Sequence, residues 1–362
     1  MNRLLTTYRL RPPGITWPVV QQMVRDGTVG AHIQVGDYFN VMRGALNLRW
    51  DVVDIGSSTR NVTANGNAPT DPNYFTNFPN AKPVTLLMHD VINGAVFDAP
   101  EANYQITTQI NSGVQCNITL ESETIASATY DFTAPSDLVI GGRLRISNAM
   151  TLHYYVSPYT AAPTAITMVA GSAYGSIAAS LSAQNHKHRV SNGSNKYTES
   201  AVRQWLNAGG AAASFWVSKS NYDLAPSWHA TWAGFLNGLD TEFQAVIGET
   251  TREVELNTVT DGGSVTPNTT IADKVFLASE KEIFNDAENA GHKGVQFQGY
   301  AGSVNADRIK YDAAALSTAR SWWMRSPDAW GAITACRVYT SGVLGVNYVS
   351  DGCGAAAACV IL

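Results

Sequence analysis

The chain has 362 residues, of which 45% are hydrophobic and 15% charged, with a net charge of -5 and an isoelectric point near 5.8. This length predicts about two domains, and the low charged content favours a β-rich or irregular fold over long solvated helices. The acidic balance disfavours a nucleic-acid-binding protein, because phosphate neutralisation requires a basic surface.

Residues 1–30 are predicted to form a separate small element. Pro12, Pro13 and Gly14 interrupt the chain, and a short helix is expected over residues 19–25, ending near Gly27. The first residues lack the apolar run of a signal peptide, and no stretch of ~18 apolar residues follows. We therefore expect synthesis in the cytosol and no membrane span.

Residues 31–94 are predicted to contain strands. Apolar and polar residues alternate over 32–39, with Gly36-Asp37 as a turn, and over 46–53, as in half-buried strands, and residues 84–88 form a short buried run. The stretch 61–83 is rich in Asn, Pro and Thr, which indicates a long loop.

Residues 95–165 carry a second set of alternating runs at 104–107, 116–120, 128–132 and 144–146. Gly113, Pro135 and the Gly141-Gly142 pair separate them at the spacing of a small sandwich. The sequence therefore predicts a small inserted β-sandwich-like domain, with 31–94 and 166–362 forming one α+β domain around it.

Helical patterns dominate residues 195–250. Thr198 is the expected N-cap of a helix that Gly209 and Gly210 end, and a second helix is expected over 232–246 from apolar residues spaced i, i+3, i+4, i+7. Ser279 and Glu282 have the spacing of a capping box, which predicts a third short helix. From there to residue 321 the chain is expected to be loop-like.

The tail, residues 321–362, returns to strands. Trp322 and Trp323 are adjacent and would point to opposite faces of a strand, and we interpret both as core anchors. Arg325 is expected to satisfy nearby carbonyl groups or a carboxylate. Residues 335–340 and 343–349 predict a hairpin with its turn at 341–342, and residues 359–362 a final apolar strand.

Enzyme signatures are absent from the sequence. It has no P-loop, no GxSxG elbow, no HExxH, no Rossmann glycine fingerprint and no zinc-ligand spacing. Cys116, Cys336, Cys353 and Cys359 are expected to be free buried thiols, while a disulfide among the last three stays open. We expect no catalytic residues, no metal and no cofactor.

The composition of the tail is unusual for a solvated surface. Residues 328–354 contain no Lys, Glu, Gln or Met. Randomising both adenines of an Asn codon can produce Tyr, Asp, Ser, Gly, Thr, Ile, Val or Arg, but none of those four missing types. This pattern is what targeted adenine mutagenesis over a binding surface would leave.

Five segments in fixed order carry a family resemblance, and the resemblance as a whole covers most of the chain, from about residue 33 to the end. They are residues 197–207, 238–240, 256–263, 308–311 and 322–327. Together they resemble phage and prophage proteins that end in a C-type-lectin-like domain. Several such proteins are variable proteins diversified by retroelements, of which the major tropism determinant of a phage is one.

The resemblance implies a C-type-lectin-like α+β fold whose variable C-terminal region, residues 321–362, displays exchangeable side chains on a fairly flat surface. The ligand-binding variable positions implied by this register are Trp330, Gly331, Ile333, Thr334, Arg337, Tyr339, Gly345, Val346, Asn347, Tyr348, Ser350 and Asp351. Two departures leave the exact register open: Ala335-Cys336 stands where members carry Val-Arg, and residues 355–357 are Ala where members carry Val-Ala-Pro.

The resemblance implies a virion protein on a phage tail or capsid surface that binds a host-cell surface protein or glycan. Its other expected partners are phage particle proteins and further copies of itself, as a trimer, with residues 1–30 serving attachment or oligomerisation. Two alternatives stay open. One is a structural capsid- or tail-decoration protein whose β insertion is the adhesive part, as on a tail fibre. The other is a relic of a formylglycine-type oxidase using Cys353 and Cys359.

Overall fold

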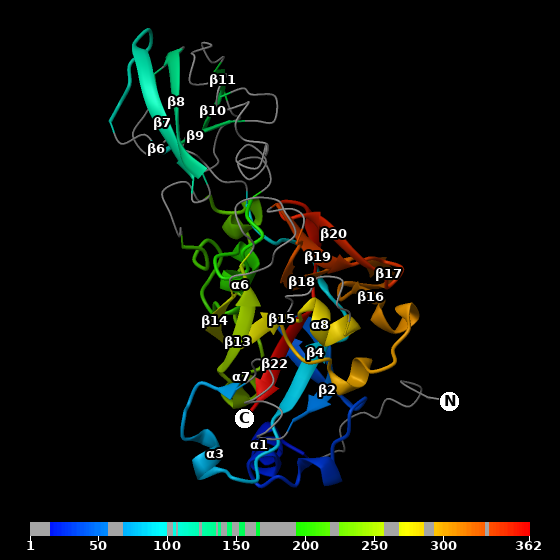
Figure 1. Ribbon diagram of the computed structural model, residues 1–362. Coiled ribbons are helices and arrows are strands. Elements are labelled where there is room, and N and C mark those ends of the chain that lie inside the picture. The colour runs from blue at the N-terminus through cyan, green and yellow to red at the C-terminus, as the bar shows by residue number, and fades with distance from the viewer. Residues whose placement is uncertain are drawn as a thin grey trace.

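The computed structural model describes residues 15–56, 68–99, 193–217, 224–256, 268–285, 293–329 and 333–362, together with shorter pieces between 104 and 166 (Figure 1). These residues form a mixed α+β structure in which strands dominate and the helices are short. The predicted α+β class is confirmed at this level.

One sheet lies at the centre of the body, and the C-terminal strand is one of its interior strands, paired on both sides (Figure 1). The alternating pattern at 46–53 and the apolar runs at 84–88 and 359–362 all become strands of this sheet, as predicted. Its main path, in order, is β1 (Tyr38–Arg43), β2 (Leu46–Ile55), β4 (Val84–Met88), β22 (Ala357–Ile361) and β12 (Ile247–Gly248), and β15 (Val275–Leu277) also pairs with β22.

A second sheet carries the tail. Its order is β20 (Leu344–Tyr348), β19 (Thr334–Val338), β18 (Trp322–Pro327), β21 (Gly352–Ala355) and β5 (Ile92–Val96). The predicted hairpin is confirmed as β19 paired antiparallel with β20. Trp322 and Trp323 are both fully buried and belong to two different core clusters, which confirms that they point to opposite faces.

Smaller pairings and short helices complete the body. β13 (Thr250–Glu255) lies between β14 (Asn268–Asp273) and β3 (Ala68–Pro69), and β16 (Lys310–Asp312) pairs with β17 (Ala315–Arg320). The helices are α1 (Trp17–Arg25), α3 (Tyr74–Asn77), α6 (Ala201–Leu206), α7 (Thr241–Val246) and α8 (Glu280–Phe284), with 3-10 turns η1 (Val29–Ala31), η2 (Ser227–Ala230), η3 (Gln298–Tyr300) and η4 (Asn305–Arg308).

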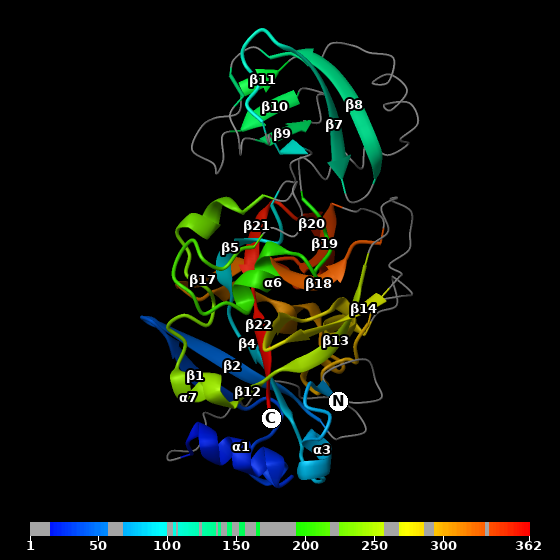
Figure 2. The same cartoon turned by 90° about the vertical axis from the view of Figure 1, so that its left-hand side faces the viewer.

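The strands of the predicted insertion pair with one another in the described part of the chain. β6 (Tyr104–Gln105), β9 (Arg143–Ile146), β10 (Leu152–Tyr155) and β11 (Thr164–Ile166) form one sheet, and β7 (Gln115–Ser122) with β8 (Ile125–Thr133) forms a hairpin. Both views place them at one end of the molecule, with α1 at the other (Figure 2). The body extends past the expected boundary at residue 95, because Ala95 pairs with Cys353 and Phe97 is fully buried.

α1 packs on the body and is not a separate element. Trp17, Val20 and Val24 are buried in the main core, and the Trp17 ring lies 4.8 Å from Phe39 and 4.5 Å from Phe243. The part of residues 1–30 that the structure describes therefore belongs to the body. Residues 1–14 lie outside the described residues.

The strand predicted before the Gly36-Asp37 turn does not form, whereas the turn itself is confirmed. The chain makes the 3-10 turn η1 and then a tight turn, in which Gly36 has a φ of 95° and the Asp37 carboxylate accepts the Gln34 backbone N–H at 2.9 Å. A positive φ of this size is costly for most residues and ends any extended run. The strand β1 begins only at Tyr38.

The second helix, predicted over 232–246, forms only in its last part, and Arg43 gives a physical reason for the loss of the first part. Its guanidinium donates hydrogen bonds to the carbonyl oxygens of Gly234 at 3.0 Å and Phe235 at 2.7 Å. A helix would need these carbonyl groups for its own backbone hydrogen bonds. Gly238, with a φ of 76°, turns the chain, and Asp240 then caps the short helix α7 by accepting the Phe243 N–H.

Two further helices begin at or near their predicted N-caps. Ser279 and Glu282 form the predicted capping box at the start of α8. The N-cap of α6 is Ser200 and not Thr198, because the Ser200 hydroxyl accepts the Arg203 backbone N–H, whereas the Thr198 carbonyl accepts a hydrogen bond from the Arg203 side chain.

The loop expected before residue 321 contains the β16–β17 hairpin. None of the helices in the described residues has the length and apolarity that crossing a bilayer requires.

Candidate functional site

The predicted binding segment stands on β18, the middle strand of its sheet. Trp323 packs its ring edge-on against Phe97, with 5.7 Å between centroids, and its indole N–H donates to the Ala95 carbonyl at 3.0 Å. On the other face the Trp322 N–H donates to the Arg308 carbonyl at 3.0 Å. β18 is thereby fixed to the body on both faces, as the interpretation of both tryptophans as core anchors required.

Arg325 holds the same strand to α8. Its guanidinium is fully buried and contacts both carboxylate oxygens of Glu282, at 2.6 and 2.8 Å, and the Leu277 carbonyl at 2.9 Å. The prediction that Arg325 satisfies carbonyl groups or a carboxylate is confirmed. Glu282 also accepts the Ser279 backbone N–H, so the ion pair and the helix cap share one side chain.

The C-terminal hairpin, residues 334–348, is built on this support. Gly342 turns the chain with a φ of 80°, and a Cβ there would lie 1.7 Å from the Asn305 carbonyl oxygen, so the turn requires glycine. The register pairs Arg337 with Gly345 and Cys336 with Val346. The tight turn therefore fixes which side chains share a face.

The hairpin has two faces of different character. Side chains of cross-strand partners share a face, and successive residues alternate. The Arg337 face carries Ala335, Arg337, Tyr339, Gly345 and Asn347, and the Val346 face carries Thr334, Cys336, Val338, Leu344, Val346 and Tyr348. Each face is buried where it meets the body and is exposed toward the outer strand, β20.

The Arg337 face holds an ordered polar cluster. The Arg337 guanidinium lies 4.5 Å from the centre of the Tyr339 ring and donates to the Cys353 sulfur at 3.6 Å, and the Asn347 amide contacts the same sulfur at 3.9 Å. Burial raises the pKa of the Cys353 thiol, and the hydrogen bond from Arg337 offsets this only in part. Cys353 is therefore a neutral thiol that lies beneath the Arg337 face and contacts Arg337 and Asn347.

Tyr339 and Gly345 are mutually dependent. The Tyr339 ring lies directly over Gly345, so that a Cβ at position 345 would come within 1.9 Å of the ring. Any side chain at 345 must push the Tyr339 ring aside, because the ring is the movable partner. Two of the positions predicted to vary are thus coupled through one contact.

Most of the predicted site residues gather on the outer part of the hairpin. Tyr339, Val346 and Tyr348 are exposed at 38%, 39% and 46%, and Asp351 is exposed just beyond β20. Five more are half-buried, namely Thr334, Arg337, Gly345, Asn347 and Ser350. The predicted positions are divided between the two faces and do not form one flat patch.

One predicted position, Ile333, does not add to this surface, and two others lie outside the described residues. Ile333 is only 6% exposed, and its carbonyl accepts the N–H of the fully buried Val349 where the hairpin leaves the body. Its side chain therefore does not reach a ligand. Trp330 and Gly331 lie outside the described residues.

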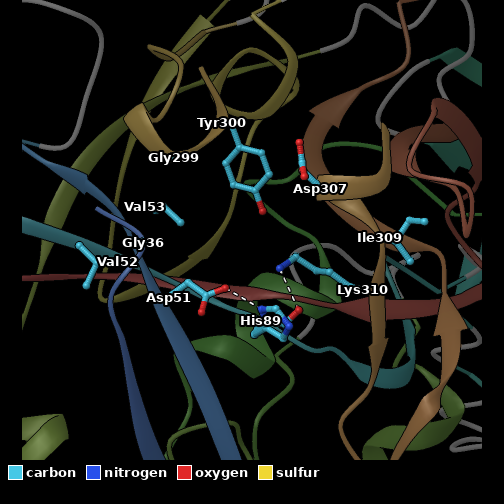
Figure 3. A pocket seen from close by; sticks show the side chains of 10 residues that line it. All are labelled: Gly36, Asp51, Val52, Val53, His89, Gly299, Tyr300, Asp307, Ile309 and Lys310. Atoms are coloured by element: carbon cyan, nitrogen blue, oxygen red, sulfur yellow. Dashed lines mark hydrogen bonds and ion pairs between the residues drawn. The ribbon is translucent and has the colours of Figure 1, made fainter. Parts of the chain in front are cut away.

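A second cluster, which the sequence did not reveal, surrounds Lys310 (Figure 3). The Lys310 amine donates to the carbonyl groups of Met88 and His89, and the His89 ring is 2.7 Å from the Asp51 carboxylate. Arg49 contacts the other oxygen of Asp51 at 2.8 Å. Figure 3 shows the Tyr300 hydroxyl pointing toward these groups from the opposite wall.

The cavity beside the Lys310 cluster has a volume of about 30 Å³. That is room for one or two water molecules and not for an organic substrate. Burial would raise the pKa of Asp51, but the hydrogen bond from His89 and the charges of His89, Lys310 and Arg49 hold it below its usual value. The cluster joins β16 to the central sheet, which is a structural role.

Lys310 gives a pH-dependent prediction. Burial lowers its pKa to about 8 in the folded chain, against ~10.4 when unfolded. Between these values the unfolded state binds more protons, so stability rises with pH relative to the Lys310→Met variant, by up to about 3 kcal/mol. Urea unfolding of both proteins from pH 7 to 10.5 measures this difference. Ionisation of the buried thiols affects the stability of both proteins equally, so it does not contribute to the difference.

The control for Lys310→Met is Lys82→Met, which removes a lysine that lies in solvent. We expect its stability difference from the wild type to stay constant with pH. A Lys310→Met difference that is equally flat over the same range would contradict a buried, proton-releasing Lys310.

Thiols and metal ligands offer no further site. Three cysteines are buried free thiols, as predicted, namely Cys336, Cys353 and Cys359. The side chain of Cys116 is not among those that the structure describes. Within the described ranges no three His, Cys, Asp or Glu side chains gather so as to hold a metal ion. The C-terminal hairpin thus remains the strongest candidate site.

Comparison with known proteins gives one match. Neither the curated proteins nor the solved structures contain a significant match to this chain. A family model described as a domain of unknown function (DUF6273) matches residues 168–361, more than half of the chain, and this range includes the whole C-terminal hairpin. The chain therefore belongs to the DUF6273 family.

Proposed function

We propose that this protein is a receptor-binding, tropism-determining component of a phage particle, and that the C-terminal hairpin is its diversified binding surface. The observation that carries the proposal is the position of Tyr339, Val346, Tyr348 and Asp351. The first three are exposed at the outer part of a hairpin whose base is anchored in the core, and Asp351 is exposed just beyond it. On this proposal the body is C-type-lectin-like and acts by recognition, without catalysis.

The residue types support recognition. Tyrosine gives a large contact area with few rotatable bonds, arginine is common at binding hot spots, and asparagine adds adaptable hydrogen bonds. Arg337, Tyr339 and Asn347 provide these three types side by side on one face. Exchange of exposed side chains usually changes stability by less than about 0.5 kcal/mol, so such a surface can vary while the fold persists.

The support beneath the hairpin favours the same proposal. Arg325, Trp322 and Trp323 lie in the core below the exposed positions and have fixed hydrogen bonds. A ligand would therefore meet a preorganised surface, which lowers the entropy cost of binding. Host-cell surface proteins or glycans are the proposed targets, and several copies on one particle would add avidity.

A binding experiment with two variants tests the proposal. In the first, Arg337, Tyr339, Asn347 and Tyr348 are all changed to alanine, and in the second the β7–β8 hairpin is replaced by a short glycine linker. Immobilised proteins are exposed to a panel of bacterial cells. We expect the alanine variant to lose at least ~90% of cell capture, since these are hot-spot types, and to keep the unfolding midpoint of the wild type within a few degrees.

The second variant separates the proposal from the decoration alternative. If the insertion is the adhesive part, capture disappears with β7–β8 and survives the four alanine changes, which would contradict a binding hairpin.

Diversification has its own test in the flanking DNA, where we expect a near-copy of the segment encoding residues 328–354 that differs only at adenines, beside a reverse transcriptase gene.

A further inference from the structure

β20 is an edge strand whose outer side lacks a partner in the described residues. It stands first in the order of its sheet. In an antiparallel pair, hydrogen-bonded residues alternate with residues whose backbone groups point away. The Val349 N–H donates to the Ile333 carbonyl, and the Tyr339 N–H donates to the Val343 carbonyl. Counting every second residue between these two bonds, the backbone groups of Gly345 and Asn347 are the ones that bond to β19. Leu344, Val346 and Tyr348 therefore turn their backbone groups outward.

Nearly all of these outward groups are unpaired in the part of the chain that the structure describes. The Tyr348 carbonyl accepts the Asp351 N–H at 3.0 Å, but no bond is made by the N–H and carbonyl groups of Leu344 and Val346 or by the Tyr348 N–H. Proteins usually protect such an edge with lysine, proline or a bulge. β20 has none of these and carries no charge.

We propose that β20 pairs with β20 of a second copy of this chain, antiparallel and about a two-fold axis at Val346. In this register Val346 faces its own copy, and Leu344 faces Tyr348 of the partner strand. At least four backbone hydrogen bonds form between groups that are now unpaired: two between the Val346 residues, and two from Tyr348 N–H to Leu344 carbonyl.

Self-complementarity favours a second copy over a foreign strand. Every outward donor meets an outward acceptor, and no like charges oppose each other. Leu344 and Tyr348 share the Val346 face, so each forms an aliphatic–aromatic cross-strand pair with the partner copy. The backbone bonds do not depend on side-chain identity, so the pairing persists when positions 346 and 348 vary among uncharged residues other than proline.

The dimer has a geometric consequence for the proposed binding surface. Joining two edges makes one continuous sheet, on which the two Arg337 faces lie side by side and point the same way. An isologous interface of this kind closes at two copies, which differs from the trimer that the family resemblance implies. The dimer itself does not depend on the proposed function, because its test measures self-association.

Sedimentation velocity of the full chain over a wide concentration range tests the pairing. Val346→Pro removes one donor from each copy, and we expect it to raise the dimer dissociation constant at least ~30-fold. The folded monomer tolerates proline there because the Val346 N–H is not bonded to β19. Val346→Thr keeps every backbone bond and is expected to leave the dissociation constant within about threefold.

A second pair of variants avoids reliance on proline. Val346→Lys places two positive charges opposite each other at the axis, and Leu316→Lys adds the same charge at an exposed position of β17, which belongs to a different sheet. We expect only the first to weaken the dimer, by at least ~10-fold. A wild type that is monomeric at all concentrations, or a dimer that both Val346→Pro and Val346→Lys leave intact, would overturn the proposal.

Discussion

Replacement of Arg325 by methionine is expected to lower the free energy of unfolding by about 3–5 kcal/mol. Methionine retains much of the buried side-chain volume, but it leaves the Glu282 carboxylate, which is 1% exposed, without its countercharge. The Leu277 carbonyl also loses its donor. Chemical denaturation followed by tryptophan fluorescence measures the loss, because several tryptophans are buried in the same core.

The double variant Arg325→Met, Glu282→Gln separates charge from packing. Glutamine keeps an oxygen that can accept the Ser279 N–H and so preserves the cap of α8, while it removes the buried charge. We expect the double variant to recover most of the lost stability, since unpaired buried charge is the costly element. A double variant as unstable as Arg325→Met alone would show that packing, and not charge, determines the effect.

Local patterns predicted the strands and short motifs that depend on neighbouring residues. The alternation at 46–53 and the hairpin around Gly342 were correct because a half-buried strand and a tight turn are encoded within a few residues. The Ser279–Glu282 capping box was correct for the same reason. In each case the interaction partners lie within one turn or one strand pair of each other.

Contacts between distant parts of the chain were not predictable in the same way. The apolar spacing over 232–246 matches a helix, yet Arg43, far away in sequence, binds the carbonyl groups of Gly234 and Phe235. The β16–β17 hairpin has weak alternation, and its Lys310 is held by carbonyl groups at the end of β4. Neither interaction can be recognised from the sequence around the residues whose local structure it determines.

The candidate site was predictable as a segment but not as a surface. Composition and family resemblance indicated the tail, and the exposed Tyr339, Val346 and Tyr348 lie within it. Which face each side chain takes depends on the register, and the burial of Ile333 depends on where the hairpin joins the body. The support of the Arg337 face by Cys353 needs the strand β21, which follows the hairpin in the chain and pairs with β18.

Replacement of Trp323 by alanine is expected to cost about 3–5 kcal/mol, the usual range for a fully buried large aromatic residue. The change removes the contact with Phe97 and leaves the Ala95 carbonyl without its donor. β18 lies between β19 and β21, so the cavity opens directly beneath the C-terminal hairpin. We therefore expect amide hydrogen exchange at Gly345 and Asn347 to accelerate together with global unfolding.

Trp323→Phe is the matched control, because it keeps an aromatic ring in the core and loses only the indole donor and part of the volume. We expect it to cost about 1–2 kcal/mol, close to the loss of one buried hydrogen bond. Hydrogen exchange with mass spectrometry compares the hairpin amides in all three proteins. If Trp323→Ala lowers global stability while Gly345 and Asn347 keep their protection, the hairpin is held independently of β18. Its exposed side chains would then owe their positions to the turn and to β19, and not to the core anchors.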